Sequence, residues 1–279
     1  MHNRKRVIQR YALLLICATA SPAWAAFDET YKLYIGGSIT NFDTTLRVNS
    51  RDESIDEEIE LEEGLGFDSS LRLGFVRGFW RMAERHRLSL VYAPIRRTSE
   101  FTSVNDINIG GNIIEAGAFI GSSVRTHVFD LEYLYSFFKR PNIEIGFTAG
   151  LYWMNSVAEL AAAGEIIIEG ENQPLFRSDY RADQRLIAPL PLIGLTAGYE
   201  FNDNWRVTAA ARFFDVTIND IEGYLASASL GAEYYFTDHV GMGTSLSWFD
   251  VSVRHNGVVF INKLTYEYAG FNAYLALKY

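Results

Sequence analysis

From residue 31 to the C-terminus, apolar side chains recur at every second position, and Gly, Asn and Asp interrupt the pattern at intervals. A period of two is typical of β-strands with two different faces, whereas a helix needs apolar residues three or four positions apart. About ten segments carry the pattern, at residues 31–47, 67–79, 84–98, 123–139, 142–157, 185–201, 204–217, 221–236, 239–254 and 260–279. This part of the chain is therefore predicted to be all-β.

The alternation leaves open which face of each strand meets water. In residues 205–213, for example, Trp205, Val207 and Phe213 alternate with Arg206 and Arg212. A soluble β-sandwich would show the same pattern. Beyond the N-terminal region, however, no run of apolar residues is long enough for a membrane-spanning helix. If this chain enters a membrane, it must do so as a closed barrel, which leaves no backbone group unpaired in lipid.

The lengths of the connections distinguish the barrel from the sandwich. Connections after the second, fourth, sixth and eighth segments are tight, at residues 81–83, 140–141, 202–203 and 237–238. Those after the first, third and fifth are long, at residues 48–66, 99–122 and 158–184, although two short ones, near 218–220 and 255–259, belong to the same set. Short turns at one end and longer loops at the other are the plan of an outer-membrane barrel. The predicted fold is a transmembrane antiparallel up-and-down β-barrel of about ten strands.

The N-terminus predicts export. Basic residues at positions 4–6 and 10 precede an apolar run at 11–20, which leads into Ala23-Trp24-Ala25. This is the layout of a removable signal peptide over residues 1–25, which leaves residues 26–279 as the barrel. A transmembrane anchor is disfavoured by the short apolar run, and a lipoprotein by the bulky Ile16 before Cys17. Because Cys17 is the only cysteine, the mature chain would have no disulfide and no thiolate site.

The last strand has a second export feature. Its residues Phe271, Leu275, Leu277 and Tyr279 share one face, and Tyr279 is the terminal residue. A terminal aromatic residue on an alternating last strand resembles the C-terminal assembly signal of bacterial outer-membrane barrels. The barrel-assembly machinery is therefore an expected partner during biogenesis.

Several stretches resemble a proteobacterial family of outer-membrane β-barrel proteins that has no settled activity. They are residues 42–47 (FDTTLR), 84–90 (ERHRLSL), 188–194 (APLPLIG) and 240–243 (VGMG). The resemblance covers most of the mature chain. It implies the fold and the compartment, and it brings no catalytic residue to this sequence.

Charged residues inside the strands are expected to point into the lumen, because the outer face of a membrane barrel must be apolar. They carry both signs, and a barrel of about ten strands is narrow enough for side chains to fill much of it. We therefore predict paired charges that close much of the bore, with Glu200 and Glu233 as partners of Arg206 and Arg212. The predicted network contains Arg72, Arg87, Asp130, Glu132, Glu144, Glu200, Arg206, Arg212 and Glu233, with Lys32 beside it. A narrow polar pathway is the alternative.

No recognisable catalytic motif accompanies these charges. Omptin proteases, which are ten-stranded barrels, use paired aspartates and an Asp/His pair at the extracellular rim. Candidates of those residue types are His127, Asp130, Asp215, Asp250 and His255, but His127 has the outward parity of Phe129. No phosphate-binding glycine loop or zinc spacing is present. The chain is predicted to be non-enzymatic and without a cofactor, and its net charge of −9 argues against a nucleic-acid partner.

The first long connection is strongly acidic. Its carboxylates are Asp52, Glu53, Asp56, Glu57, Glu58, Glu60, Glu62 and Glu63. A solvated, self-repelling loop is one interpretation. The other is a segment that binds divalent metal ions through carboxylate oxygens and bridges them to phosphates of neighbouring lipopolysaccharide. It lacks the glycine and the ligand alternation of an EF-hand.

Together these features predict a monomeric, non-enzymatic outer-membrane barrel, in contact with membrane lipid and lipopolysaccharide. Its expected role is in the envelope or in surface interaction through the long extracellular loops. A narrow, porin-like solute channel is the first alternative, and an outer-membrane hydrolase is the second.

Overall fold

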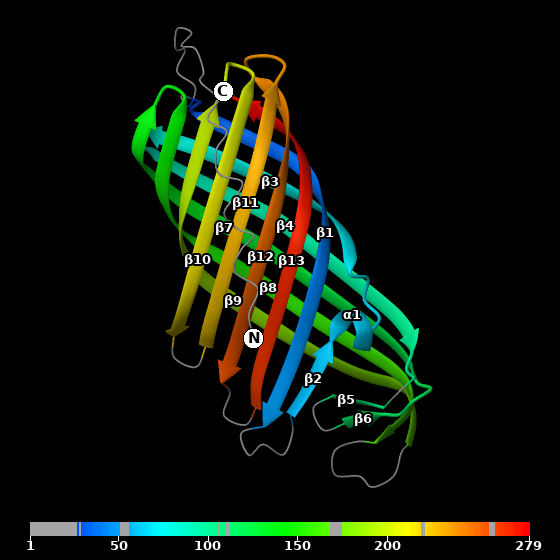
Figure 1. Ribbon diagram of the computed structural model, residues 1–279. Helices are drawn as coiled ribbons and strands as arrows, with labels where there is room; N and C mark the ends of the chain where they lie inside the picture. Colours follow the sequence, from blue (N-terminus) through cyan, green and yellow to red (C-terminus); the bar gives the residue numbers. More distant parts are fainter. Residues whose placement is uncertain are drawn as a thin grey trace, which may run out of the picture.

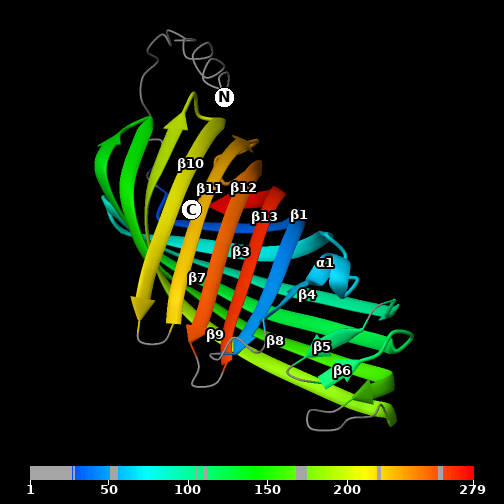
Figure 2. The same cartoon turned by 60° about the horizontal axis from the view of Figure 1, so that its bottom comes forward.

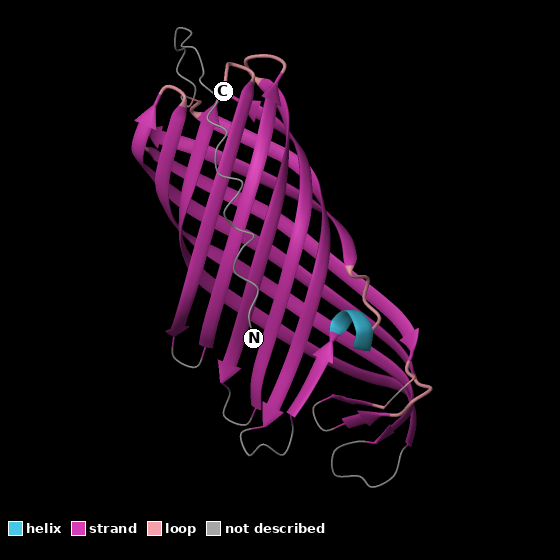
Figure 3. Ribbon diagram, viewed as in Figure 1, coloured by secondary structure: helices cyan, strands magenta, loops and turns pink. Residues whose placement is uncertain are grey.

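The protein is a closed antiparallel barrel of ten long strands (Figures 1 and 3). The computed structural model describes residues 27, 29–50, 56–104, 106–109, 112–167, 175–218, 221–256 and 260–279. The barrel strands are β1 (Tyr31–Ser50), β3 (Ser70–Ala83), β4 (His86–Thr102), β7 (Phe119–Arg140), β8 (Ile143–Ile167), β9 (Leu175–Glu200), β10 (Trp205–Ile218), β11 (Ile221–Tyr235), β12 (Val240–Asn256) and β13 (Phe260–Lys278). Each pairs with its two neighbours in chain order, and β13 closes the ring against β1. The predicted up-and-down barrel is confirmed.

The short turns gather at one end, as predicted. They comprise residues 84–85, 141–142, 201–204 and 236–239. The first and last strands meet at the same end, because the N–H of Tyr31 donates to the carbonyl of Tyr279 at 2.9 Å and the N–H of Tyr279 donates back at 2.8 Å. This end lies at the top of Figure 1 and corresponds to the periplasmic side of an outer-membrane barrel. The predicted signal peptide lies outside the described residues.

The opposite, extracellular end differs from the expectation of long loops. Much of the chain between residues 99 and 184 continues as strand in β4, β7, β8 and β9, and the hairpin of β5 (Ile107–Ile109) and β6 (Asn112–Ile114) is added to it. The first acidic connection contains β2 (Asp56–Glu60), paired with β1, and the short helix α1 (Leu61–Gly64). The sequence around Ala161 consists of small residues and has little periodicity, so it did not predict a strand. Ala161 is extended because it pairs with a strand on each side, with Gly121 on β7 and with Arg181 on β9.

The extracellular extension has a small apolar core of its own. It consists of Ile114, Ala118, Ile120, Ala162 and Ile166, all at most 4% exposed. Figure 2 shows this sheet projecting from one side of the barrel, where β5 and β6 lie at the ends of the neighbouring strands and β6 pairs with the end of β8. The extension is therefore a packed structure and not a set of separate loops.

The two faces of the wall differ as a membrane requires. Large apolar side chains point outward along the barrel, among them Ile39 (55% exposed), Leu246 (61%) and Ile193 (66%). In water such a surface would be a large apolar patch, but in lipid it is the favourable outer band of a barrel. Phe271, Leu275, Leu277 and Tyr279 lie on this face, as their parity predicted.

One seam of the wall ends well before its two strands do. The ladder between β9 and β10 stops at the pair Ile193 and Phe213, although β9 continues for many residues beyond it. Pro189 and Pro191 lie just past that point and pair only with β8. Proline has no N–H to contribute to a ladder, and so it suits a strand segment with one partner.

Candidate functional site in the barrel interior

A network of buried charges closes the periplasmic end of the bore. Nζ of Lys32 on β1 donates to Oε2 of Glu233 on β11 at 2.6 Å, and both side chains are nearly inaccessible. Arg206 on β10 donates from Nε to Oε1 of Glu200 at 2.5 Å and from Nη1 to Oε1 of Glu29 at 2.6 Å. The predicted pairing of Arg206 with Glu200 is confirmed.

Glu29 is a partner that the sequence pattern did not reveal, because it precedes the first strand. Phe27, which is 3% exposed, packs beside it with the Arg206 guanidinium 4.5 Å from its ring centre. Burial alone would raise the pKa of the Glu29 carboxyl, but Arg206 and then Lys32 hold that pKa at about 2. Phe27 and Glu29, which precede β1, thus lie at the periplasmic mouth, where the Glu29 carboxylate is a partner of Arg206.

A second ion-pair group lies on the opposite wall. Arg81 on β3 makes a bidentate contact with Glu144 on β8, at 2.7 and 3.0 Å, and Ser136 donates to the same carboxylate at 2.6 Å. Arg87 lies 3.5 Å from Glu144. The predicted inward positions of Arg87 and Glu144 are correct, and Arg81 is an addition to the predicted network.

The third group crosses the middle of the bore. Arg212 on β10 forms an ion pair with Asp130 on β7, lies 3.8 Å from Glu132, and donates to Ser227 at 3.2 Å. Its expected partners, Glu200 and Glu233, were wrong. Those carboxylates lie on neighbouring strands but nearer the periplasmic end, whereas Asp130 reaches Arg212 across the bore.

Arg72 is a correction to the predicted network. It is exposed on the outer wall, opposite outward-facing Ile39, and it is not a lumen residue. The prediction assumed that large apolar residues of β3 face lipid, but Phe75 and Phe79 turn into the bore. Arg77 and Arg81 share the parity of those phenylalanines. Two arginines of β3 thus have inward parity and only Arg72 has outward parity, and this majority could have indicated the inward face from the sequence.

The extracellular half of the bore is mainly apolar, which the sequence analysis did not predict. Its buried cluster comprises Phe42, Val128, Tyr152, Met154, Ala188, Leu190, Leu192, Phe214, Leu225, Phe249, Val251, Val253 and Tyr266. The hydroxyls of Tyr152 and Tyr266 lie 3.0 Å apart, and so these polar groups are paired inside the cluster. A narrow polar pathway, the alternative considered above, does not fit the apolar side chains of this half.

The extracellular mouth is closed by α1 and the residues that follow it. Arg97 on β4 donates to Glu62 at 2.6 Å and to Thr44 at 3.0 Å, and the second oxygen of Glu62 accepts the N–H of Thr44 at 2.9 Å. Leu61, Leu65 and Phe67 pack under this cap. Glu62 therefore has a structural role in an ion pair.

The other acidic residues give less information about a metal site. Glu60 and Glu63 are exposed, only the backbone of Asp56, Glu57 and Glu58 is described, and Asp52 and Glu53 lie outside the described residues. Within the described part of the chain, no group of three or more His, Asp or Glu side chains is placed to hold a metal ion. Cation binding by this segment stays a prediction.

The candidate catalytic residues point in different directions. His127 faces outward and its Nδ1 lies 3.0 Å from the Tyr92 hydroxyl, whereas Asp130 is buried in the bore with Arg212. Asp215 and Asp250 have outward parity on β10 and β12. The side chain of His255 is outside the described set.

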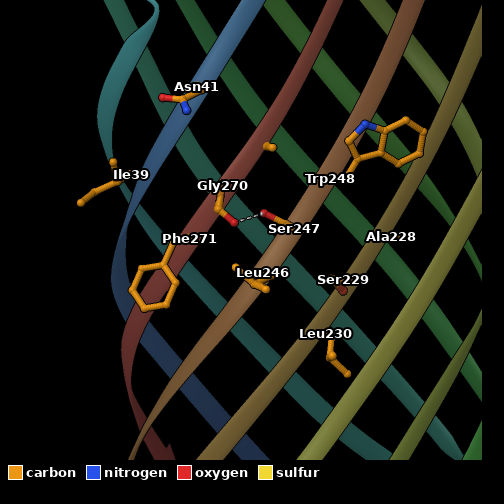
Figure 4. Close-up of a pocket in the computed structure, with 11 residues that line it drawn as sticks. Ile39, Asn41, Ala228, Ser229, Leu230, Leu246, Ser247, Trp248, Gly270 and Phe271 are labelled. Atoms are coloured by element: carbon orange, nitrogen blue, oxygen red, sulfur yellow. Dashed lines mark hydrogen bonds between the residues drawn. The ribbon is translucent and has the colours of Figure 1, made fainter. Parts of the chain in front are cut away.

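Among the residues that the structure describes, two hollows can be named on the outer wall. One, of about 670 Å³, is formed where the outward side chains of Leu230, Leu246 and Phe271 surround the small residues Ala228 and Gly270 (Figure 4). The other, of about 220 Å³, is polar and is formed by Thr45, Arg47, Lys263 and Thr265. Both open away from the bore.

Comparison with solved structures supports the membrane fold. The outer membrane protease OmpT from Escherichia coli is 14% identical, with a TM-score of 0.57, and the match covers 90% of this chain and 97% of that one. An apolar outer band on a closed barrel, together with this fold, identifies the compartment. The chain is an outer-membrane β-barrel protein. At 14% identity the likeness to OmpT concerns the fold alone.

More distant outer-membrane barrels also match. The toluene transporter TodX from Pseudomonas putida is 9% identical with a TM-score of 0.38, covering 90% of this chain and 89% of TodX. OprG from Pseudomonas aeruginosa is 10% identical with a TM-score of 0.34, covering 90% of this chain and 97% of OprG. No protein-family model and no curated protein sequence matches the chain. Among the described residues, no helix is long and apolar enough to span a membrane.

Proposed function

We propose that this barrel is a non-enzymatic surface protein that presents its extracellular sheet for interaction, and is not an open solute channel. The observation that carries the proposal is the continuation of β7, β8 and β9 into an extension with its own apolar core. A packed extension offers a preformed binding surface, which loses less conformational entropy on binding than mobile loops would.

The filled bore argues against the channel alternative. Lys32, Glu233 and Arg206 close its periplasmic end, and Arg97 with Glu62 closes its extracellular end. Between them lies an apolar cluster whose members Met154, Leu225 and Val251 are at most 1% exposed. A hydrated pathway would require these side chains to move apart.

Planar-bilayer recording tests the closed bore. We expect the purified protein to show no steady conductance. A variant with Phe27→Ala and Arg206→Ala, which removes bulk at the periplasmic end, should show brief openings if the opposite cap also moves. Steady conductance by the unaltered protein would establish the channel alternative instead.

A shortened variant tests the surface role. The N–H of Ser103 donates to the carbonyl of Ala118 at 2.9 Å, and so a short turn can replace residues 104–117 without separating β4 from β7. Cells that display this variant should adhere less to protein-coated surfaces than cells displaying equal amounts of the full-length protein. Equal adherence contradicts the surface role, and turnover of peptides or lipid A by the full-length protein contradicts the non-enzymatic role.

A further inference from the structure

The outer wall changes from apolar to charged at a sharp boundary on the extracellular side. On β3, β4, β7 and β9, the first outward charged residue beyond the apolar band is an arginine: Arg72, Arg96, Arg125 and Arg185. On β1, β10, β11, β12 and β13 it is a carboxylate: Asp43, Asp215, Glu222, Asp250 and Glu267. On β8 it is Glu159. Apart from Glu159, the two sides of the barrel thus have opposite charge where the lipid band ends.

Three arginines of the first group lie along one cross-strand row. Arg96 pairs directly with Arg125, which pairs with Val157, which pairs with Arg185. Arg72 and Arg96 each lie four residues beyond Val76 and Tyr92, the pair at which the ladder between β3 and β4 ends on the extracellular side. Like charges placed directly opposite on neighbouring strands are destabilising unless an anion lies between them.

Internal partners neutralise only part of this charge. Arg125 forms an ion pair with Glu159, whose side chain is 48% exposed, and Nε of Arg185 donates to Asn155 at 3.4 Å. Among the described residues, no ion pair or hydrogen bond from a side chain reaches the guanidinium of Arg72 or Arg96. Both are exposed.

The surface just below this arginine group is aromatic. Tyr92 and Phe129 lie with ring centres 4.9 Å apart, and the Tyr92 hydroxyl contacts His127. Aromatic side chains of this kind form the girdles at the interfaces of membrane barrels. The arginines therefore lie at the depth of lipid headgroups, with an apolar wall below them for acyl chains.

We propose that Arg72, Arg96 and Arg125 bind a phosphate group of a phosphorylated glycolipid of the outer leaflet, whose acyl chains lie along β4 and β7. Guanidinium groups bind phosphate with two parallel hydrogen bonds, which makes arginine better suited than lysine to this role. The bound phosphate would also offset the repulsion between Arg96 and Arg125.

The opposite wall should bind this lipid less well. Its first outward residues, Asp43, Glu267 and Asp250, form one cross-strand row of carboxylates. Cationic side chains occur on that wall only four residues further along each strand toward the extracellular end, at Arg47, Lys263 and Arg254. The lipid is therefore held mainly on one side of the barrel.

Native mass spectrometry of the detergent-purified barrel with bisphosphorylated lipid A tests the proposal. We expect Arg72→Gln with Arg96→Gln to weaken lipid retention by about tenfold or more, because charge-assisted bonds to phosphate are lost. Arg254→Gln makes the same kind of charge change on the opposite wall and should have little effect. Equal retention by the double variant and the unaltered protein would overturn the proposal.

Further arms identify the source of the phosphate and control for folding. Dephosphorylated lipid A should bind weakly to the unaltered protein, and millimolar inorganic phosphate should not displace the bisphosphorylated lipid. Full displacement by inorganic phosphate would show a site for free anions and overturn the lipid assignment. Arg96→Lys, which keeps the charge and the fold, should lose part of the retention because it loses the bidentate geometry. Full retention by this variant would count against bidentate binding.

Discussion

At the scale of single residues, the stability of this barrel depends on charges that water does not reach. The side chain of Lys32 is 0% exposed and that of Glu233 is 3% exposed. Tyr235 donates to the same carboxylate at 2.8 Å. Removing one partner of such a pair leaves the other charged, buried and unpaired, which costs far more than the pair contributes to stability.

The buried pair gives the first residue-scale prediction. Glu233→Gln should lower the free energy of unfolding by about 3 kcal/mol or more, measured by urea unfolding in detergent micelles. The double variant Lys32→Met with Glu233→Leu should recover most of that loss, because no uncompensated charge remains. Glu222→Gln serves as the matched control. It removes a partner of Arg254, and both side chains are more than 40% exposed, so the change should cost about 1 kcal/mol or less. Equal losses for Glu222→Gln and Glu233→Gln would contradict this account.

At the scale of elements, the acidic segment is held by packing as well as by pairing. β2 adds to the edge of β1, and α1 places Leu61 and Leu65 beside Phe67 at the extracellular mouth. The Arg97 guanidinium lies 5.1 Å from the Phe67 ring centre and binds Glu62 at the same time. One buried arginine therefore compensates the charge of Glu62 and attaches α1 to β4.

That anchor predicts the result of limited proteolysis. Arg97→Gln should accelerate cleavage near residues 52–63, because Glu62 loses its partner and α1 its attachment. Chelator is the separate test of the metal hypothesis in membranes that contain lipopolysaccharide. If divalent ions bridge the segment to lipid phosphates, chelator should accelerate cleavage of the unaltered protein as well. Equal rates with and without chelator would contradict the metal bridge and leave the Arg97 anchor unaffected.

At the scale of the whole molecule, closure of the ring depends on β13 meeting β1. Tyr279 exchanges two backbone hydrogen bonds with Tyr31, while its side chain is 82% exposed on the outer wall. Lys278, its neighbour in sequence, faces inward with Nζ 4.1 Å from the Tyr235 ring centre. Tyr279 and Lys278 are therefore neighbours at the same end of the chain, but the Tyr279 side chain faces outward and the Lys278 side chain faces the bore.

This contrast predicts how the barrel assembles. Tyr279→Asp should reduce the amount of protein that folds in the outer membrane more than Lys278→Asp does, because the exposed aromatic group is the expected recognition element. The measurement is the fraction of membrane protein that migrates anomalously on a gel until it is heated. Equal reductions would contradict recognition of the terminal aromatic residue.

Local periodicity was enough to predict the ten strands, their order and the end at which the turns gather. A side chain that faces lipid must be apolar, and this requirement applies to each strand residue separately, so the alternation along a strand indicates which side chains face lipid. The same reasoning correctly placed Glu144, Arg206 and Glu233 inside the bore. It failed at Arg72, where the apolar residues of β3 fill the lumen and so imitate a lipid-facing row.

The sequence by itself determined the fold class, the membrane-facing wall and the presence of an inward charge network, because each follows from a repeated local pattern. Only the tertiary structure decided which charged residues form ion pairs with each other. Arg212 meets Asp130 across the bore, Glu29 joins Arg206 from outside the strands, and Glu62 closes the mouth through Arg97. It also placed Arg72 on the outer wall, opposite Ile39. These contacts depend on how the closed sheet brings distant strands together, which no local period records.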